Sequence, residues 1–538
     1  MRILTASDHA LLVEAADLDE AMRLNLAWLG VHGVVERIPG ARTVLVRFDP
    51  LVVSAAELAD ALAATEVDTA HLPATGEVTV PVRYDGEDLD EAASLLSVSA
   101  TELVNRHLAA DWKVAFSGFA PGFGYVVSSD PLFAVPRRSS PRTRVPAGSV
   151  ALAGQFTGVY PRESPGGWQL IGRTDALMWD IDRDPPALLS PGTTVRFESV
   201  REQARLRADP TVPENRDEEV PVRRVAERHA AGGTLDPGFP AAAPAAAVEI
   251  VRPSLQLLVQ DAGRPGFAAL GVSASGVADR RAMREANRAV GNASDAAVLE
   301  SVGGAVLRFR GAGVAAVAGA VGSLELIDAG GVARQIAHGA PFATVEGDEL
   351  SLGHPTSGLR YVIAVRGGVA AEPALDSRAS DTLAGLGPAP LAAGDVLGVG
   401  DSAPHPVEPE TTPRTLPAPG DLVDLEITLG PRDDWFTPAA LGTLTSQEWT
   451  VTPRSDRVGI RLEGAVPLER AISGELPSEG AVTGAIQVPP DGQPVLFLPD
   501  HPLTGGYPII GALTDSSLDL AGQLPPGARV RFIIKETS

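Results

Sequence analysis

An internal repeat restricts the fold of this chain more than any other feature of its sequence. The same segments recur in the same order in both halves: GSVALAGQ (148–155), GGWQLIGRTD (166–175) and PGTTVRF (191–197), then GAVTGAIQ (480–487), GGYPIIGALTD (505–515) and PGARVRF (526–532). The intervals between them differ in length, which is typical of homologous β domains, because loops accept insertions while strands keep their register. The repeat predicts two related β domains and places Gln155 and Gln487 at one equivalent position.

Each copy carries two adjacent glycines before an aromatic residue, in GGW at 166–168 and GGY at 505–507. Paired glycines permit backbone conformations that other residues resist, and they allow a ligand to approach closely. A bulge or a barrel corner would also use them, so a structural role is the alternative. In the first copy the pair ends the segment PRESPGG (161–167), which we interpret as the rim of a ligand groove.

Composition narrows the classes of function. Hydrophobic residues make up 44% and charged residues 21% of the 538 residues, which indicates a folded chain, and the 56 glycines and 46 prolines favour many strands and tight turns. The net charge of −24 argues against binding to nucleic acid or to anionic lipid. The absence of cysteine excludes disulfides, thiol nucleophiles and iron–sulfur clusters. We expect a cytoplasmic protein outside the membrane, because the sequence has neither a signal-peptide pattern nor a long apolar run.

The expected order of strands and helices divides the chain into domains. Residues 1–76 read as strand, helix, strand, strand, helix and strand, which suits a ferredoxin-like α/β unit. Residues 201–247 combine a charged run with AAAPAAA, a composition typical of linkers. The other expected divisions are a mostly β domain at 77–200, a further β domain at 248–405, a proline-rich linker at 406–420 and a final β domain at 421–538. The expected fold class is mainly β with an N-terminal α/β unit.

Several loop residues in the first half could carry chemistry. Four arginines crowd residues 137–144, where planar guanidinium groups could capture a carboxylate or a phosphate; a solvated turn is the alternative. Glu163 and Ser164 could supply a general base and an orienting hydroxyl, or they could be ordinary surface residues. Gln155 and Gln487 could hydrogen-bond a lactam or urea group, or they could be buried structural amides.

Further candidates lie in the second half. Asp261 and Arg264, in QDAGRPG, suit a turn-fixing ion pair and an anion contact equally, and Asp491 in PPDG is most often a turn residue. The full set of candidates is Arg144, Glu163 and Ser164 for catalysis, and Arg142, Gln155, Arg162, Gly166, Gly167, Asp261, Arg264, Gln487, Asp491, Thr504, Gly505, Gly506 and Tyr507 for binding.

Several familiar catalytic systems are absent from the sequence. It contains no G-x-x-x-x-G-K-[ST] phosphate loop, no Met-Lys-Met-like biotin acceptor and no serine-rich amidase core. The nine histidines show no metal-ligand spacing, so we expect no metal site built by this chain alone.

The longest motifs resemble a known family. GFAPGFGYV, PRRSSPRTRVPAGSVALAGQFTGVYPRESPGGWQLIGRTD and SPGTTVRF are similar to allophanate hydrolase subunit 1, also described as the B-type subunit of bacterial 5-oxoprolinase and as a sporulation-kinase inhibitor. The motifs similar to subunit 2, the C-type subunit of 5-oxoprolinase, are LLVQDAGRPGFAALGVSASGVADRRAMREANRAVGNASDAAVLE (257–300), VRGGVAAEPALDSRASDT (365–382), SDRVGIRLEG (455–464) and SEGAVTGAIQVPPDGQPVLFLPDHPLTGGYP (478–508). Both subunits also resemble the carboxyltransferase region of urea carboxylase. The chain therefore resembles a fusion of the two subunits over nearly its whole length.

The resemblance carries expectations about fold and function. It implies cyclophilin-like barrels for the β domains, and a component of an ATP-dependent 5-oxoprolinase that hydrolyses the lactam of 5-oxoproline to glutamate. ATP with Mg2+ and a separate subunit of the lactam-utilisation family are implied as well. The alternatives are a carboxyltransferase-like component for urea or allophanate, served by separate biotin-bearing partners, and a non-catalytic regulator of a histidine kinase. Self-association is left open.

One departure from the family pattern affects the expected ligand contacts. Family members often carry a basic and polar run before TGGYP, where this chain has Asp500-His501-Pro502-Leu503.

Overall fold

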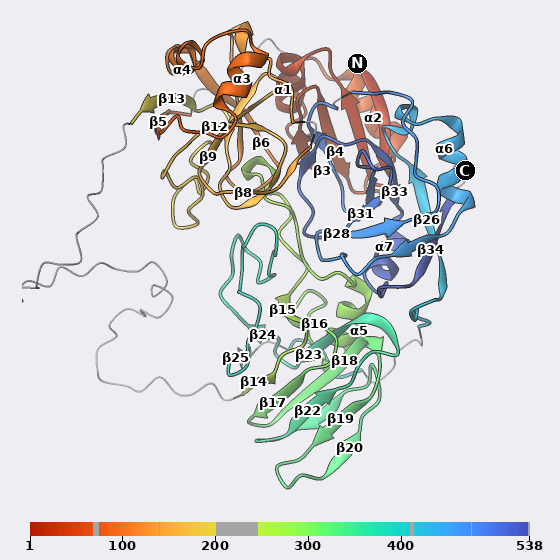
Figure 1. Ribbon diagram of the computed structural model, residues 1–538. Coiled ribbons are helices and arrows are strands. Elements are labelled where there is room, and N and C mark those ends of the chain that lie inside the picture. Colours follow the sequence, from red (N-terminus) through yellow and green to blue (C-terminus); the bar gives the residue numbers. More distant parts are fainter. Residues whose placement is uncertain are drawn as a thin grey trace, which may run out of the picture.

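The computed structural model describes residues 1–67, 75–138, 140–200, 246–401, 403–408, 414–474 and 476–535, and it is mainly β (Figure 1). The expected linker 201–247 lies outside the described residues except for its last two positions. None of the helices in the described ranges is long and apolar enough to cross a membrane.

The N-terminal unit is a four-stranded antiparallel sheet with two helices. Its elements are β1 (Arg2–Ser7), β2 (Ala10–Glu14), α1 (Leu18–Ala27), β3 (Val34–Pro39), β4 (Thr43–Phe48) and α2 (Ala55–Ala64). The order β1-β2-β4-β3 is that of a ferredoxin-like sheet. The strand that we expected after the second helix falls mostly at residues 68–74, outside the described residues. The edge beside β2 is formed by β1, which pairs with β2 as a hairpin before the chain reaches α1.

The first barrel follows. Its elements are β5 (Glu77–Val82), α3 (Leu89–Leu95), α4 (Ala100–Ala109), β6 (Trp112–Ser117), β7 (Gly124–Ser128), β8 (Arg142–Val145), β9 (Ser149–Ala153), β10 (Phe156–Val159), β11 (Ser164–Gly166), β12 (Gln169–Arg173) and β13 (Thr194–Ser199). The seven-stranded sheet has the order β12-β9-β10-β7-β6-β13-β5. Backbone hydrogen bonds between Arg83 and Arg173 (2.8 and 2.9 Å) join its two edges. Strands β8 and β11 form a separate two-stranded antiparallel sheet.

The middle domain consists of two sheets around a common core, with a helix on the smaller sheet. Its elements are β14 (Ala247–Arg252), β15 (Gln256–Gln260), α5 (Arg280–Val290), β16 (Val298–Val302), β17 (Val306–Arg310), β18 (Gly313–Val321), β19 (Leu324–Ile327), β20 (Ala333–Gln335), β21 (Phe342–Thr344), β22 (Glu349–Leu352), β23 (Ser357–Val365), β24 (Val369–Ala370) and β25 (Val396–Val399). The orders are β20-β19-β22-β17-β14-β25-β24 and β15-β16-β23-β18-β21. Leu257, Leu307 and Ile363 are buried in the core between the two sheets.

The second barrel repeats the architecture of the first. Its elements are β26 (Leu422–Leu429), α6 (Pro438–Ser446), β27 (Trp449–Val451), β28 (Gly459–Glu463), β29 (Glu479–Gly480), β30 (Ala485–Gln487), β31 (Val495–Phe497), β32 (Thr504–Gly505), β33 (Ile509–Leu513), α7 (Asp515–Ala521) and β34 (Arg529–Ile534). The closed order β26-β33-β30-β31-β28-β27-β34 matches the strand order of the first barrel, and β29 and β32 form the corresponding two-stranded sheet. In each barrel a buried tryptophan donates from Nε1 to a carbonyl five residues earlier, Trp112 to His107 (2.8 Å) and Trp449 to Leu444 (3.0 Å).

The register of the repeat corrects one expectation. Gly148 (φ +78°) donates to Tyr160 O and accepts from Thr174 N, and Gly484 (φ +86°) makes the same two bonds with Phe497 O and Leu513 N. The segment that corresponds to 148–155 is therefore 484–491. The expected alignment with 480–487 is four residues too early.

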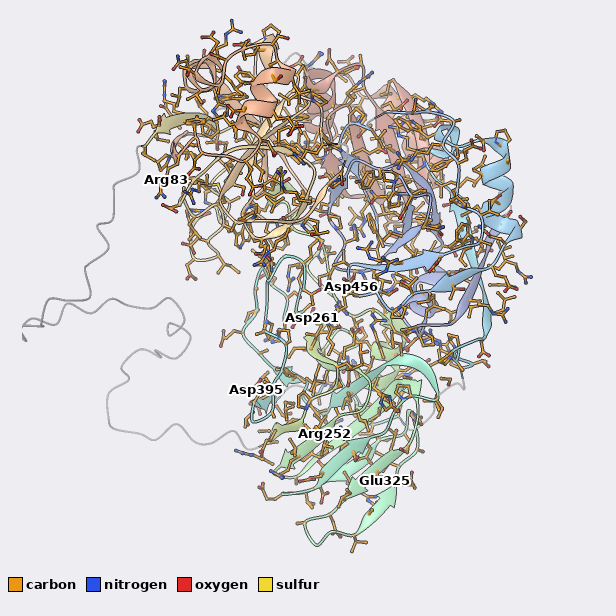
Figure 2. The ribbon with its side chains drawn as sticks, in the orientation of Figure 1. Arg83, Arg252, Asp261, Glu325, Asp395 and Asp456 are labelled. Atoms are coloured by element: carbon orange, nitrogen blue, oxygen red, sulfur yellow. The ribbon has the colours of Figure 1, made fainter. Side chains whose placement is uncertain are left out.

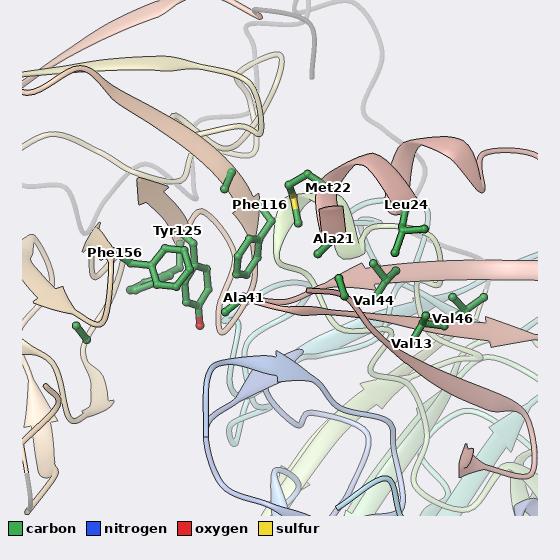
Figure 3. Packing of buried hydrophobic residues seen from close by; sticks show 14 of the residues in the cluster. Val13, Ala21, Met22, Leu24, Ala41, Val44, Val46, Phe116, Tyr125 and Phe156 are labelled. Carbon is green, nitrogen blue, oxygen red and sulfur yellow. The ribbon is translucent and has the colours of Figure 1, made fainter. Parts of the chain in front are cut away.

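The N-terminal sheet lies between the two barrels (Figure 1). Side chains alternate across a strand, so the apolar strand β2 buries both of its faces. Leu11 and Val13 belong to a buried cluster that continues through α1 to aromatic residues of the first barrel, and Figure 3 shows Val13 beside Val46 in this cluster. Ala10 and Leu12 pack against the second barrel. One small sheet thus holds the two barrels side by side.

Candidate functional site

A cavity of about 350 Å³ lies between the two barrels. Both diglycine edges line it. Its walls are formed by Phe119, Phe123, Tyr125, Arg137, Arg138, Pro141, Tyr160, Pro165, Gly166, Gly167, Trp168, Arg470, Gly474, Ser478, Gln487, Pro490, Pro502, Thr504, Gly505, Gly506 and Tyr507. The repeat has therefore produced one composite cavity, to which each barrel contributes its diglycine edge.

Direct contacts fix the two barrels across this cavity. Thr504 Oγ1 accepts the Phe119 N–H (2.9 Å) and lies 3.1 Å from Tyr125 Oη, and it is only 1% exposed. Arg137 Nη2 donates to Ser478 Oγ (2.8 Å), and the Ser478 carbonyl accepts from Ala41 N (2.7 Å) in the N-terminal unit. The walls of the cavity are thus held by hydrogen bonds between different domains.

Three of the four rim glycines have close neighbours, whereas a Cβ at Gly167 would make only ordinary contacts with Pro141. A Cβ atom at Gly506 would lie 1.7 Å from Arg137 Nη1, and one at Gly166 would lie 2.2 Å from Tyr160 Oη. At Gly505 the nearest atom would be Gln487 Nε2, at 2.6 Å. The paired glycines therefore let polar side chains come close to the rim.

Aromatic rings form one wall. Phe123 makes edge-to-face contacts with Tyr125, Tyr160 and Trp168 at centroid distances of 5.2, 5.4 and 5.2 Å. Burial raises the pKa of Tyr160, so its hydroxyl stays protonated at neutral pH. The wall combines flat apolar surface with a phenol that can donate a hydrogen bond.

Two guanidinium groups give the cavity its charge. Arg470 Nη2 donates to Val488 O (2.5 Å), and its guanidinium carbon lies 5.8 Å from the centre of the Tyr507 ring. Within the part of the chain that the structure describes, Arg137 and Arg470 have hydrogen bonds to neutral groups and no ion pair, although Asp491 acts on Arg470 through space. Arg138 differs, because Asp88 lies 2.7 Å from its Nη1. The cavity therefore favours a ligand with a negative charge.

Several predicted binding residues come together here. Those that line the cavity are Gly166, Gly167, Gln487, Thr504, Gly505, Gly506 and Tyr507. Our candidates did not include Arg470, the aromatic residues other than Tyr507, or Arg137, which was noted only as one member of the arginine cluster.

The predicted catalytic residues lie outside the lining. Arg144 Nε and Glu163 Oε2 form an exposed ion pair at 2.6 Å, with side chains that are 75% and 51% exposed. Ser164 is buried, and its Oγ donates to Arg162 O at 3.4 Å. Arg142 is held by Asp88, with Nη1 and Nη2 at 2.9 and 2.7 Å from its two oxygens.

Gln155 is a further correction. It lies exposed in the turn between β9 and β10, whereas Gln487 is a buried residue at the end of β30, whose amide donates to Tyr507 O (3.4 Å). The predicted equivalence of the two glutamines is wrong, because Asp491 and not Gln487 corresponds to Gln155. Asp491 is itself exposed and accepts from Gln493 N (3.1 Å), as a turn residue does.

Asp261 and Arg264, the two candidates in QDAGRPG (260–266), lie at the junction of the middle domain with the barrels, where Figure 2 labels Asp261. Asp261 accepts from Ser377 Oγ and Arg378 N, both at 2.6 Å. Arg264 is 1% exposed and donates to the carbonyls of Ala374 (3.2 Å) and Ala379. Asp261 and Arg264 therefore both hold the loop at 374–379. They do not form the ion pair with each other that we considered. Arg162 approaches the same region, because a Cβ at Gly385 would lie 2.6 Å from its Nη1.

A buried carboxyl group at this junction leads to a pH-dependent prediction. Burial and the nearby Asp500 raise the pKa of Asp381 to about 6 from 3.8, so the folded chain binds an extra proton between these values. The associated stabilisation is complete below about pH 4 and is lost as the pH rises through about 6. Asparagine stays neutral and can still accept from Ala384 N and donate to Ser273 Oγ, the two groups that Asp381 binds.

We therefore expect Asp381→Asn to raise the free energy of unfolding by about 1 to 3 kcal/mol at pH 8 and to change it little at pH 4. Urea denaturation at both pH values measures the difference. A variant that is less stable than the wild type at pH 8 would contradict the proposed cost of the ionised carboxylate.

Comparisons with known proteins agree with this architecture. Residues 1–189 match the family model "Carboxyltransferase domain, subdomain C and D", and residues 270–534 match "Carboxyltransferase domain, subdomain A and B". The chain is 39% identical over 191 residues to the B-type subunit of 5-oxoprolinase from Escherichia coli O157:H7, covering 34% of this chain and 87% of that protein. It is 31% identical over 290 residues to the C-type subunit of 5-oxoprolinase from Escherichia coli K12, covering 53% of this chain and 90% of that protein.

Two further similarities extend the comparison. The crystal structure of TTHA0988 matches with a TM-score of 0.77 and 33% identity, covering 97% of this chain and 99% of the other. Urea amidolyase of Lachancea kluyveri is 30% identical over 315 residues, covering 53% of this chain and 17% of that protein.

Two homologous barrels that close one cavity and match both subdomain pairs define a carboxyltransferase-domain protein, and the chain belongs to that family. Within the family it joins in one polypeptide the parts that resemble the B-type and C-type subunits of 5-oxoprolinase.

Proposed function

We propose that this chain is the fused B–C component of an ATP-dependent 5-oxoprolinase, which opens the lactam of 5-oxoproline to glutamate together with a separate subunit of the lactam-utilisation family. The observation that carries the proposal is the composite cavity, because both diglycine edges line it and each comes from a part that resembles a different 5-oxoprolinase subunit. Neither barrel alone could form it.

The cavity has the chemical features that this substrate requires. The lactam ring of 5-oxoproline is compact and nearly flat, and it matches the aromatic wall around Phe123 and Tyr160. The Tyr160 hydroxyl and the Gln487 amide are neutral groups that could hydrogen-bond the lactam N–H and carbonyl. Substrate contacts are therefore assigned to these side chains, while Arg144 and Glu163 form an exposed ion pair outside the cavity lining.

The energetics explain the proposed use of ATP with Mg2+. A five-membered lactam is a stable amide, and phosphorylation of its oxygen would make the carbonyl carbon electrophilic towards water. In this proposal the residues of the chain bind and orient the lactam, exclude bulk water with the aromatic wall and provide positive charge near the reacting groups.

Reconstitution tests the proposal. The purified chain is mixed with its lactam-utilisation partner, and glutamate release from 5-oxoproline is measured with and without ATP. We expect release only when both proteins and ATP are present. A complex that forms and yet releases no glutamate in the presence of ATP would refute the proposed function.

The similarity to urea amidolyase supports a second candidate, a carboxyltransferase component that acts on a urea-type substrate. That activity would require a biotin-bearing partner. Carboxylation of urea in the presence of such a partner, with no lactam hydrolysis, would favour it over the 5-oxoprolinase.

A further inference from the structure

Two arginines face the cavity from opposite barrels, and each is held in place by neutral groups. Arg137 precedes β8 in the first barrel, donates to Ser478 Oγ at 2.8 Å and abuts Gly506. Arg470 precedes β29 in the second barrel and is held by Val488 O at 2.5 Å. Side chains that are already held lose little conformational freedom when they bind a ligand.

The charges around them distinguish these arginines from their neighbours. In the cluster at 137–144, Asp88 forms ion pairs with Arg138 and Arg142, and Glu163 forms one with Arg144. Asp88 has a side chain that is only 3% exposed, and the Arg142 and Leu170 N–H groups hold its pKa below the ordinary value against the effect of burial. Asp88 is thus fully engaged and leaves the guanidinium of Arg137 without a carboxylate partner among the described residues.

Arg470 also lacks a carboxylate partner among the described residues, although its Nη2 donates to Val488 O. Its Nε is buried and has no hydrogen-bond partner among the described residues. Arg470 as a whole is half-buried, and Asp491 acts on it through space without forming an ion pair. A half-buried guanidinium with an unused, buried donor gains from an anion, because the anion supplies the hydrogen bond that water cannot. An anion held between Arg137 and Arg470 would lie beside the aromatic wall, where a flat ring can pack.

We propose that Arg137 and Arg470 together bind the carboxylate of the substrate and so select a compact amide that carries a carboxylate over a neutral amide. This inference rests on the proposed function and extends it to specificity. In 5-oxoproline the carboxylate is attached next to the ring nitrogen, so one molecule can present the carboxylate to the arginines and the lactam to Tyr160 and Gln487. A neutral amide leaves both guanidinium groups unpaired, and sites built around polar groups reject ligands that leave those groups unpaired.

Calorimetry with the full chain tests the proposal with three probes: 5-oxoproline, 2-pyrrolidinone, which is the same lactam without the carboxylate, and urea. We expect 5-oxoproline to bind at least 30-fold more tightly than either neutral amide, about 2 kcal/mol. Arg137→Gln and Arg470→Gln should each weaken 5-oxoproline binding at least 10-fold and leave 2-pyrrolidinone binding unchanged. Arg454→Gln removes an exposed arginine of the second barrel and is the matched control, with an expected change below twofold.

Equal affinity for 5-oxoproline and 2-pyrrolidinone would overturn the proposal, as would unchanged affinity in both arginine variants or no binding of 5-oxoproline to the chain. Thermal unfolding checks that the variants fold, and if Arg470→Gln does not fold, Arg137→Gln decides. Kinetics of the reconstituted enzyme distinguish a failure of the carboxylate assignment from a failure of the proposed function. If it hydrolyses 5-oxoproline with the wild-type KM in both variants, the carboxylate assignment fails and the proposed function stands; if the wild type hydrolyses nothing, the proposed function fails.

Discussion

Replacing Arg457 by methionine is expected to lower the free energy of unfolding by about 3 to 5 kcal/mol. Arg457 is fully buried in the second barrel, and its Nε lies 3.1 Å from Asp500 Oδ2. It also contacts Glu300 and donates to Gly276 O (2.5 Å), both in the middle domain. Burial alone would lower the pKa of Arg457, but Asp500 and Glu300 raise it above its ordinary value. The variant would leave two buried carboxylates without their shared cation.

The size of this effect depends on burial, so an exposed pair provides the control. Arg531 and Asp424 lie 2.8 Å apart on the same barrel, with side chains that are 43% and 52% exposed. Arg531→Met should therefore change stability by less than about 1 kcal/mol. Urea denaturation of the full chain at pH 7 measures both variants. A loss below about 1 kcal/mol for Arg457→Met would mean that the domains are not held together by this network.

Gly506→Ala is expected to lower glutamate release by the reconstituted enzyme about 100-fold, the effect of displacing a positioning group by roughly 1 Å. The added Cβ would lie 1.7 Å from Arg137 Nη1, so the guanidinium must move away from the rim. The backbone of Gly506 is not in the left-handed region, so alanine should be accommodated by the fold. The loss should therefore appear in turnover and not in thermal stability.

A glycine in an open position provides the control for this substitution. Gly442 lies in α6 of the same barrel, and a Cβ there would meet no atom within 4 Å. Gly442→Ala should retain wild-type turnover. If Gly506→Ala also retained full activity, the rim around Arg137 would have no part in binding the substrate.

The barrels could be predicted from sequence because repeated strands and turns leave a repeated pattern. The parallel pairs Val78–Val195 and Val423–Val530 join corresponding first and last strands, as PGTTVRF and PGARVRF indicated. The register could not be read as easily. Matching glutamines suggested one alignment, whereas the left-handed glycines at 148 and 484 determine another. A glycine that ends a turn and bonds to two strands constrains the backbone more than a similar side chain does.

The site was predictable only in part, because charge pairing depends on contacts between distant residues. The sequence indicated an arginine cluster, but it could not reveal that Asp88 engages two of its members and leaves Arg137 facing the cavity. Arg470 stands alone in LERAISGE and carries no local signal. Asp500, which we noted as a departure from the family pattern, is the buried partner of Arg457.

A crystal structure of the chain with 5-oxoproline tests the central claim most directly. We expect the ligand between the two diglycine edges, with its carboxylate at Arg137 and Arg470 and its ring against the wall around Phe123. Ligand bound at any other place on the chain, with this cavity empty, would contradict the claim that the paired barrels form the substrate site.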